Sequence, residues 1–124
     1  MEDSAFIYLS FLRKTLLALP HVTEQLLHGT PAFYVGKKII ARLWDDAETL
    51  VIGTLEREKW ITTQPDVYYI TDHYQNYAYM LVRLKNADPQ QLEALLIVAW
   101  RNRAPKKAIK QYEDNEPGIG TIVA

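Results

Sequence analysis

The spacing of apolar positions changes along the chain and marks out its elements. Leu9, Leu12 and Leu16 recur at helical spacing. Pro20 ends this helix because the residue before a proline is pushed out of the helical region. The next apolar runs are short and rich in β-branched and aromatic residues, which is typical of strands. They predict four strands, carried by "VTEQLLH", by the two runs flanking Gly36–Lys37, and by "TLVIGT".

The stretch "HGTPAFYVGKK" predicts a hairpin and the bend before it. Gly36–Lys37 suits a two-residue turn of type II′, in which glycine takes the first central position. Residues 29–31 are most simply the bend that starts this hairpin, while the sequence leaves the role of His28 open. The expected register pairs opposite residues of the two strands, namely Tyr34 with Ile39 and Ala32 with Ala41.

The second half of the chain alternates again between helical and strand patterns. A short helix is expected over residues 55–62, followed by strands at "VYYIT" and "AYMLVRLK". The clearest helix begins at Asp88, an N-cap followed by Pro89, with Gln91 completing a capping box. One more short helical segment is expected at "PKKAIKQYE". The order α-β-β-β-β-α-β-β-α predicts an α+β domain, a single antiparallel sheet with helices packed mainly on one face.

Length and composition bound the class of protein. With 124 residues, 48% of them apolar, the chain is expected to fold as one domain over 1–112, with a C-terminal extension over 113–124. The absence of cysteine excludes disulfides, thiolate zinc sites and a catalytic thiol. The chain lacks a positively charged signal segment and an apolar run of membrane-spanning length. These features predict a soluble cytoplasmic protein without a membrane partner.

Charge is distributed unevenly, although the formal net charge is only −1. Between Glu93 and Glu113 the chain carries five bases and no acid, and "EDNE" then holds three acids. Five bases exceed what complements the negative end of a helix, so phosphate contact is the sharper interpretation and a solvated helix end the plainer one. The near-neutral total argues against a strongly basic nucleic-acid binder.

Residues able to perform acid–base chemistry are few. His28 and Thr30 stand at one loop entrance, and a second loop holds His73, Tyr74 and Tyr77. If the two loops met at one end of the sheet, these side chains would line a pocket able to bind a small ligand or to transfer a proton. The sequence holds no metal-binding histidine spacing, serine elbow or phosphate-binding glycine loop, so no catalytic residue, metal or cofactor is expected.

Tyrosines are concentrated in one part of the chain, with five of the eight between residues 68 and 79. Aromatic rings on a sheet can stack single-stranded bases. They are also good strand formers whose cross-strand pairs stabilise sheets, and this structural interpretation is the better supported one.

Several segments, taken in order, resemble one family. They are "HGTPAFYVGKKIIARLWDD", "REKW", "ITDHY" with "AYMLVRL", and "LLIVAWRNRAPKKAIKQY", which together span roughly residues 16–112. With them the chain resembles the MmcQ/YjbR-like family of small bacterial cytoplasmic proteins, described as carrying a double-wing DNA-binding motif. The resemblance implies a small α+β fold, no established enzyme activity, and a candidate wing in the hairpin around Gly36–Lys37–Lys38.

The function that the sequence favours is a DNA-binding or regulatory protein without catalytic activity. Phosphate contacts are expected from the hairpin wing and the basic C-terminal helix, through Lys37, Lys38, Arg42, Arg101, Arg103, Lys106, Lys107 and Lys110. The alternative is a small-ligand-binding protein or enzyme with a pocket lined by His28, Thr30, His73, Tyr74 and Tyr77.

Overall fold

The chain folds around one open antiparallel sheet of six strands, as seen in a computed structural model that describes residues 2–115. The strands lie in the order β1-β2-β3-β4-β6-β5, and every neighbouring pair is antiparallel. In chain order the elements are α1 (Glu2–Leu16), β1 (Val22–Leu27), β2 (Thr30–Val35), β3 (Lys38–Leu43), β4 (Thr49–Gly53), α2 (Arg57–Thr63), β5 (Tyr68–Tyr69), the 3₁₀ helix η1 (Asp72–Tyr74), β6 (Tyr79–Arg83), the 3₁₀ helix η2 (Leu84–Asn86), α3 (Pro89–Arg103) and α4 (Lys106–Asn115). The predicted α+β class and order of elements are confirmed, with α4 as the additional helical segment.

Element bounds differ from the predicted ones mainly at the ends. Helix α2 starts two residues later than expected, and β5 keeps only two residues of the run "VYYIT". Helix α4 continues to Asn115, beyond the predicted domain end at residue 112. The rest of the predicted C-terminal extension, residues 116–124, lies outside the described residues. No helix among the described residues combines the length and the apolar character needed to cross a membrane.

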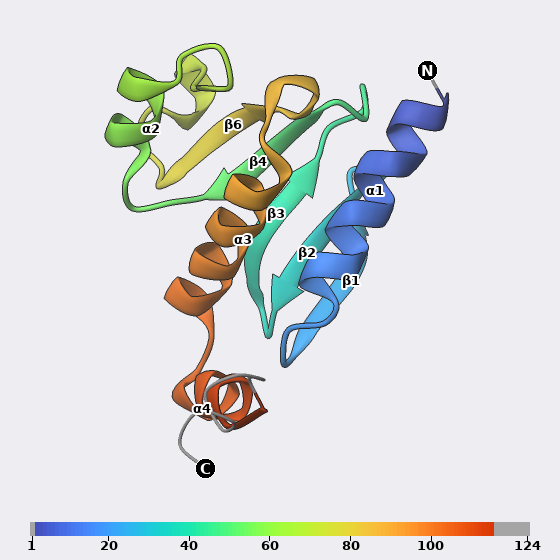
Figure 1. Cartoon of the computed structure of the whole chain (residues 1–124), viewed down its shortest axis with the longest axis vertical. Coiled ribbons are helices and arrows are strands. Elements are labelled where there is room, and N and C mark those ends of the chain that lie inside the picture. The colour runs from blue at the N-terminus through green and yellow to red at the C-terminus, as the bar shows by residue number, and fades with distance from the viewer. Residues whose placement is uncertain (1, 116–124) are drawn as a thin grey trace.

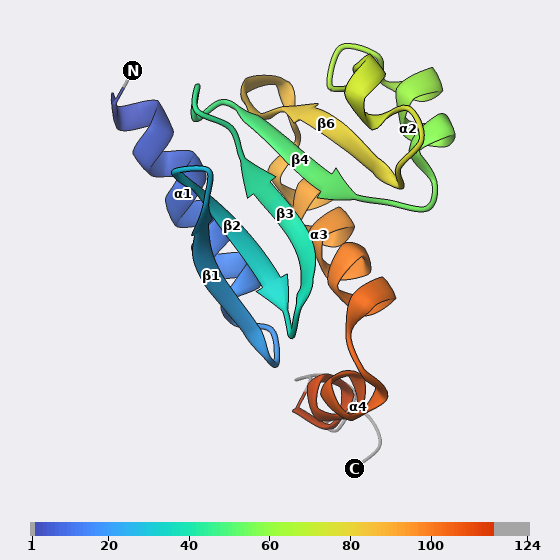
Figure 2. The same cartoon turned by 180° about the vertical axis from the view of Figure 1, so that it is seen from behind.

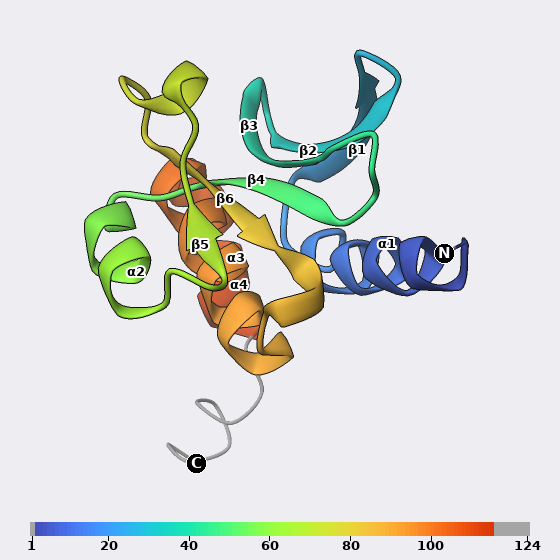
Figure 3. The same cartoon turned by 90° about the horizontal axis from the view of Figure 1, so that it is seen from above.

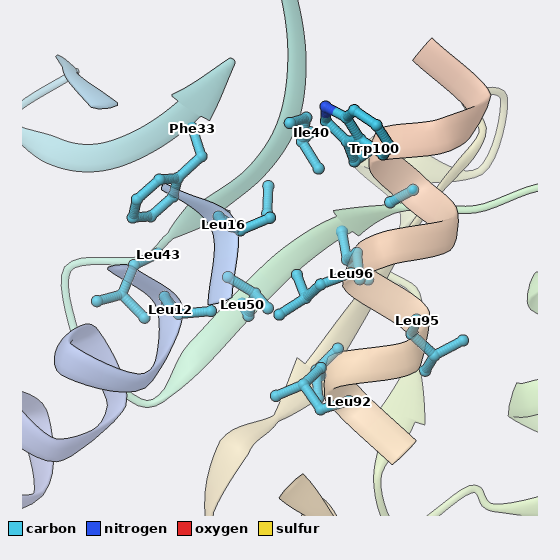
Figure 4. Packing of buried hydrophobic residues seen from close by; sticks show 14 of the residues in the cluster. Leu12, Leu16, Phe33, Ile40, Leu43, Leu50, Leu92, Leu95, Leu96 and Trp100 are labelled. Carbon is cyan, nitrogen blue, oxygen red and sulfur yellow. The ribbon is translucent and has the colours of Figure 1, made fainter. Parts of the chain in front are cut away.

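Helices α1 and α3 cover the same face of the sheet, and the hydrophobic core lies between them and the strands (Figure 1). Leu16 of α1 packs beside Phe33, while Trp100 of α3 packs beside Ile40 (Figure 4). The indole Nε1 of Trp100 donates a hydrogen bond to the carbonyl of Pro20 at 3.0 Å. This bond ties the end of α3 to the connection between α1 and β1.

The start of α3 is fixed by the predicted N-cap. The carboxylate of Asp88 accepts the backbone N–H of Gln91 at 3.0 Å. The side chain of Gln91 does not complete a capping box, because its Oε1 accepts the hydroxyl of Tyr68 at 2.5 Å. Burial, with a further contribution from the charge of Asp88, raises the pKa of Tyr68 to about 12.

Positive backbone φ angles mark the turns of two hairpins. Gly36, at φ 60°, opens the turn between β2 and β3, as a type II′ turn requires. His28 and Gly29, at φ 53° and 81°, form a type I′ turn between β1 and β2. Residues 28–29 are therefore the turn of a separate hairpin, and not only a bend before the next one.

A β-bulge changes the register of the β2–β3 hairpin. Tyr34 pairs with Ile39 as predicted, but β3 then contains one extra residue. Ala32 therefore pairs with Arg42 and not with Ala41, which was the predicted partner. The bulge turns Ala41 toward the core and places Arg42 on the opposite face. Nothing in the alternation of apolar residues signals this insertion.

We expect the identity of residue 28 to matter through its backbone conformation. Asparagine adopts the left-handed region readily, so His28→Asn should leave the free energy of unfolding unchanged or slightly raised. The β-branched variant His28→Val should lower it by about 1–2 kcal/mol. Urea denaturation of both variants measures the difference. A loss for His28→Asn as large as that for His28→Val would contradict the turn role.

We expect Tyr68 to make stability fall in alkali. An unfolded tyrosine ionises at about pH 10, while the folded pKa of Tyr68 is raised, so the unfolded chain gains from ionisation first. At neutral pH, Tyr68→Phe should cost about 1 kcal/mol through the lost hydrogen bond. The advantage of the wild type over Tyr68→Phe should shrink as pH rises from about 10 toward 12. Chemical denaturation of both proteins across this range is the measurement, and a constant difference would count against the shift.

Candidate functional site

Exposed lysines stand on two segments toward the same end of the molecule's long axis, the turn between β2 and β3 and the start of α4 (Figure 1). Lys37 and Lys38 stand at this turn, and Lys106 and Lys107 form the start of α4. All four side chains are exposed, and none forms an ion pair with a carboxylate among residues 6–115, whose side chains the structure describes. We call these four lysines the basic end.

The other predicted bases are less available. The Nη1 atom of Arg101 lies 2.9 Å from Oε2 of Glu113, and Nζ of Lys110 lies 3.3 Å from Oδ2 of Asp114. Two of the acids that follow the basic run, Glu113 and Asp114, thus pair with bases of that run. Arg42 and Arg103 lie elsewhere, on the sheet. The eight predicted bases therefore fall into three groups: the four lysines of the basic end, the ion-paired Arg101 and Lys110, and Arg42 and Arg103 on the sheet.

The sheet face opposite α1 and α3 has no helix in front of β1 to β4 (Figure 2). Directly paired residues of neighbouring strands share a face. One row of such pairs crosses the whole sheet from β1 to β5: Gln25, Ala32, Arg42, Val51, Leu81 and Tyr69. None of these residues belongs to the core beneath the helices. Tyr34, Tyr79 and Arg83 stand two positions from members of this row and therefore share its face.

Arg103 reaches the same face from the end of α3. Strands β3 and β4 pair only over Ala41–Leu43, and α3 is visible between their separated ends (Figure 2). The guanidinium carbon of Arg103 lies 5.4 Å from the centroid of the Tyr79 ring. It also lies 2.5 Å from where a Cβ on Gly53 would stand, so glycine leaves room for it. We name the resulting set the tyrosine–arginine face: Tyr34, Arg42, Tyr69, Tyr79, Arg83 and Arg103.

The arginines of this face are held by neutral groups. The guanidinium of Arg83 lies 4.0 Å from the centroid of the Tyr69 ring. Arg42 donates to the hydroxyl of Thr30 at 3.0 Å. Arg42, Arg83 and Arg103 form no ion pair with any carboxylate of the described residues. Each guanidinium is therefore partly exposed and has no carboxylate of those residues directly against it.

The nearest acidic turn forms no ion pair with Arg42, although Asp45 and Asp46 line one hollow with it. Asp46, in the turn between β3 and β4, accepts the backbone N–H groups of Glu48 and Thr49, both at 2.9 Å, and the Thr49 hydroxyl at 2.8 Å. Burial alone would raise the pKa of Asp46, but these hydrogen bonds lower it. Its carboxylate is thus ionised at neutral pH and engaged within its own turn.

The predicted pocket of histidines and tyrosines is not assembled. His28 and Thr30 lie at the β1–β2 turn, at one edge of the sheet, whereas the other three residues lie in the connection between β5 and β6, at the opposite edge. The two loops also lie at opposite ends of the strands. Expecting both groups to line one pocket was therefore wrong, because sequence order does not reveal the strand order.

Each group instead borders its own open hollow. His28 and Thr30 help line one of about 440 Å³ with Leu43 and Trp44. Tyr77, with Gln75 and Arg57, helps line another of about 580 Å³. No group of three histidine, aspartate or glutamate residues within residues 2–115 is placed to hold a metal.

Arg57 is a structural residue that the sequence pattern does not reveal. Its guanidinium donates to the backbone carbonyls of Tyr74, Tyr77 and Tyr79 at 2.8, 2.5 and 3.2 Å, and also to that of Gln75. One side chain thus fixes the connection between β5 and β6. This connection borders the tyrosine–arginine face and leads into β6, whose first residue is Tyr79.

Sequence reasoning found only part of this face. It included Arg42 and Arg103 among the bases, but it did not connect them with Tyr34, Tyr69 or Arg83. Alternation along "AYMLVRLK" already places Tyr79, Leu81 and Arg83 on one side of a strand. The missing information is the pairing of β4 with β6, which brings that side next to Arg42.

Comparison with known proteins supports the resemblance seen in the sequence. The YjbR family model matches residues 17–102. Uncharacterized proteins of Mycobacterium bovis (Mb2600) and Mycobacterium tuberculosis (Rv2570) are each 36% identical to this chain, with 78% of this chain and 88% of each relative covered. The crystal structure of Deinococcus radiodurans protein DR2400, described with the domain DUF419, has a similar fold at a TM-score of 0.66 and 20% identity, covering 89% of this chain and 92% of that one. The chain belongs to the YjbR family.

Proposed function

We propose that this protein binds DNA, without catalysis, through phosphate contacts made by the basic end. The observation that carries the proposal is that the β2–β3 turn, with Lys37 and Lys38, and helix α4, which starts with Lys106 and Lys107, lie toward the same end of the molecule's long axis (Figure 1). These lysines come from segments about seventy residues apart in the chain. A cluster of ammonium groups without carboxylate partners is suited to an anionic backbone, since it releases counterions on binding.

The shape of this end also supports contact with a duplex. The β2–β3 turn projects as a narrow hairpin, and α4 lies toward the same end of the long axis (Figure 1, Figure 2). A hairpin tip and a neighbouring helix can contact phosphates on two sides of a groove. The separation of the two histidine-containing loops keeps His28 apart from His73, Tyr74 and Tyr77, which supports binding over the alternative that combined them in one acid–base site.

The salt dependence of DNA affinity tests this function. Four lysines engaging three or four phosphates should give a log–log slope of about −3 to −4 on duplex DNA. The double variant Lys106→Ala/Lys107→Ala should weaken binding on all sequences alike and flatten the slope by up to about 2. Its free energy of unfolding should change by no more than about 0.5 kcal/mol, since both side chains are exposed. Fluorescence anisotropy with a short duplex at several salt concentrations measures both quantities.

A matched control is available on the same chain. Lys59 and Lys85 are also exposed lysines, but they lie on α2 and η2, away from the basic end. Lys59→Ala/Lys85→Ala removes the same formal charge and should leave the slope nearly unchanged. Equal effects of the two double variants would mean that only net charge matters. Absence of duplex binding by the wild type at low salt would refute the proposed function.

A further inference from the structure

We propose that the tyrosine–arginine face is a second, separate binding surface, and that its ligand is single-stranded nucleic acid. On this surface Tyr34, whose ring is the one left free of ring or guanidinium partners within the described residues among the tyrosines of this face, would stack against a base, while Arg42 and Arg103 would contact phosphates. The inference goes beyond the proposed function, because it concerns another side of the molecule and another form of nucleic acid. It rests on the residues of the sheet and not on the basic end.

The first support is the geometry of the face. The row from Gln25 to Tyr69 runs across all six strands, so the platform spans five strand spacings, roughly 24 Å at about 4.8 Å each. The sheet is curved, so that β1 to β3 and the connection before β6 rise on the helix-free side (Figure 3). A strand of several nucleotides fits such a platform, given that sites of about 4–16 nucleotides are usual for single-strand binders.

The second support is how the apolar middle of the face is covered. Val51 is 5% exposed and Leu81 is fully buried, although both stand on the face opposite α1 and α3. Long side chains of the neighbouring positions must therefore shield them from water. Tyr34 and Tyr79 keep part of their surface exposed within this layer. The face thus presents rings and guanidinium groups to solvent above the buried side chains of Val51 and Leu81.

The third support is charge. Arg42 uses only one hydrogen bond within the described residues, to Thr30, and Arg103 rests on the Tyr79 ring and Gly53. Neither has a carboxylate partner among the side chains of residues 6–115. A guanidinium has five N–H donors in a planar fork, which suits a phosphate. Arginines interleaved with tyrosines therefore match a ligand that alternates phosphates with planar rings.

A single strand satisfies this pattern better than a duplex does. Bases in a duplex are stacked on one another, so their flat sides are not available to a tyrosine ring. Unpaired bases expose those sides, and stacking on aromatic residues tolerates any base. An acidic peptide would pair with the arginines but would gain little from the tyrosines. The tyrosines therefore favour a single strand over a duplex or an acidic peptide.

The experiment separates stacking from phosphate contact. The probes are a fluorescent oligothymidylate of about twelve nucleotides and an abasic strand of the same backbone length. Tyr34→Ala should weaken oligothymidylate binding about 5- to 100-fold and leave abasic-strand binding nearly unchanged. Tyr34→Phe keeps the ring and should bind like the wild type. Arg42→Ala should weaken both probes, whereas Lys85→Ala, an exposed lysine on η2, should affect neither.

Thermal unfolding of each variant is measured alongside, and Tyr34→Phe keeps the test valid if Tyr34→Ala unfolds. Equal affinity of the wild type for the two probes would overturn the proposal, as would a loss in Tyr34→Phe as large as in Tyr34→Ala. If oligothymidylate binding responds only to Lys106→Ala/Lys107→Ala, the face is not the site, and the proposed function stands. If the face variants lose oligothymidylate binding while the wild type binds no duplex, this inference stands and the proposed function fails.

Discussion

One-sided burial of the sheet is the constraint on which the rest of this structure depends. Helices α1 and α3 both pack on the same face, where fully buried residues such as Leu16, Leu96 and Trp100 form the core. Burial of apolar area at about 25 cal/mol per Å² makes this contact the main source of stability. The opposite face receives no helix and must exclude water with its own side chains. The residue types of that face follow from the need to shield its apolar positions from water.

The helix-free face solves this problem with amphipathic residues. Tyrosine and arginine combine a large apolar body with a polar end, so they cover Val51 and Leu81 while remaining hydrated. The same residue types are those that bind nucleic acids elsewhere in proteins. The side chains that shield the apolar residues of this face are therefore of the same types that the proposed nucleic-acid binding needs. A surface chosen only for solubility would more readily carry lysine and glutamate, which shield less apolar area.

Much of the fold follows from local patterns in the sequence. The N-cap at Asp88, the glycine turn at Gly36 and the alternation along β6 each act within a few residues, and each was predictable. The bulge in β3 was not, because an inserted residue leaves the composition of the run unchanged. Its effect is large, since every later residue of the strand changes face. Arg42 reached the helix-free side in this way.

The candidate sites were less predictable than the fold, because they depend on which strands are neighbours. The lysines of the basic end were recognisable as bases, but their placement toward one end depends on where α4 lies relative to the β2–β3 turn. The histidines illustrate the opposite outcome. His28 and His73 looked like partners in the sequence, yet strand order places them at opposite edges of the sheet. Long-range pairing is a property of the whole chain, and no short motif encodes it.

The absence of a side chain at Gly53 has a consequence for communication across the molecule. It lets Arg103 lie on the sheet while remaining the last residue of α3, three positions before Lys106 at the start of α4. Any other residue at position 53 would have to displace the guanidinium of Arg103, because a Cβ there would stand 2.5 Å from it. The last residue of α3 would then lose its contact with the sheet, so the size of one side chain on β4 decides where the end of a distant helix can rest.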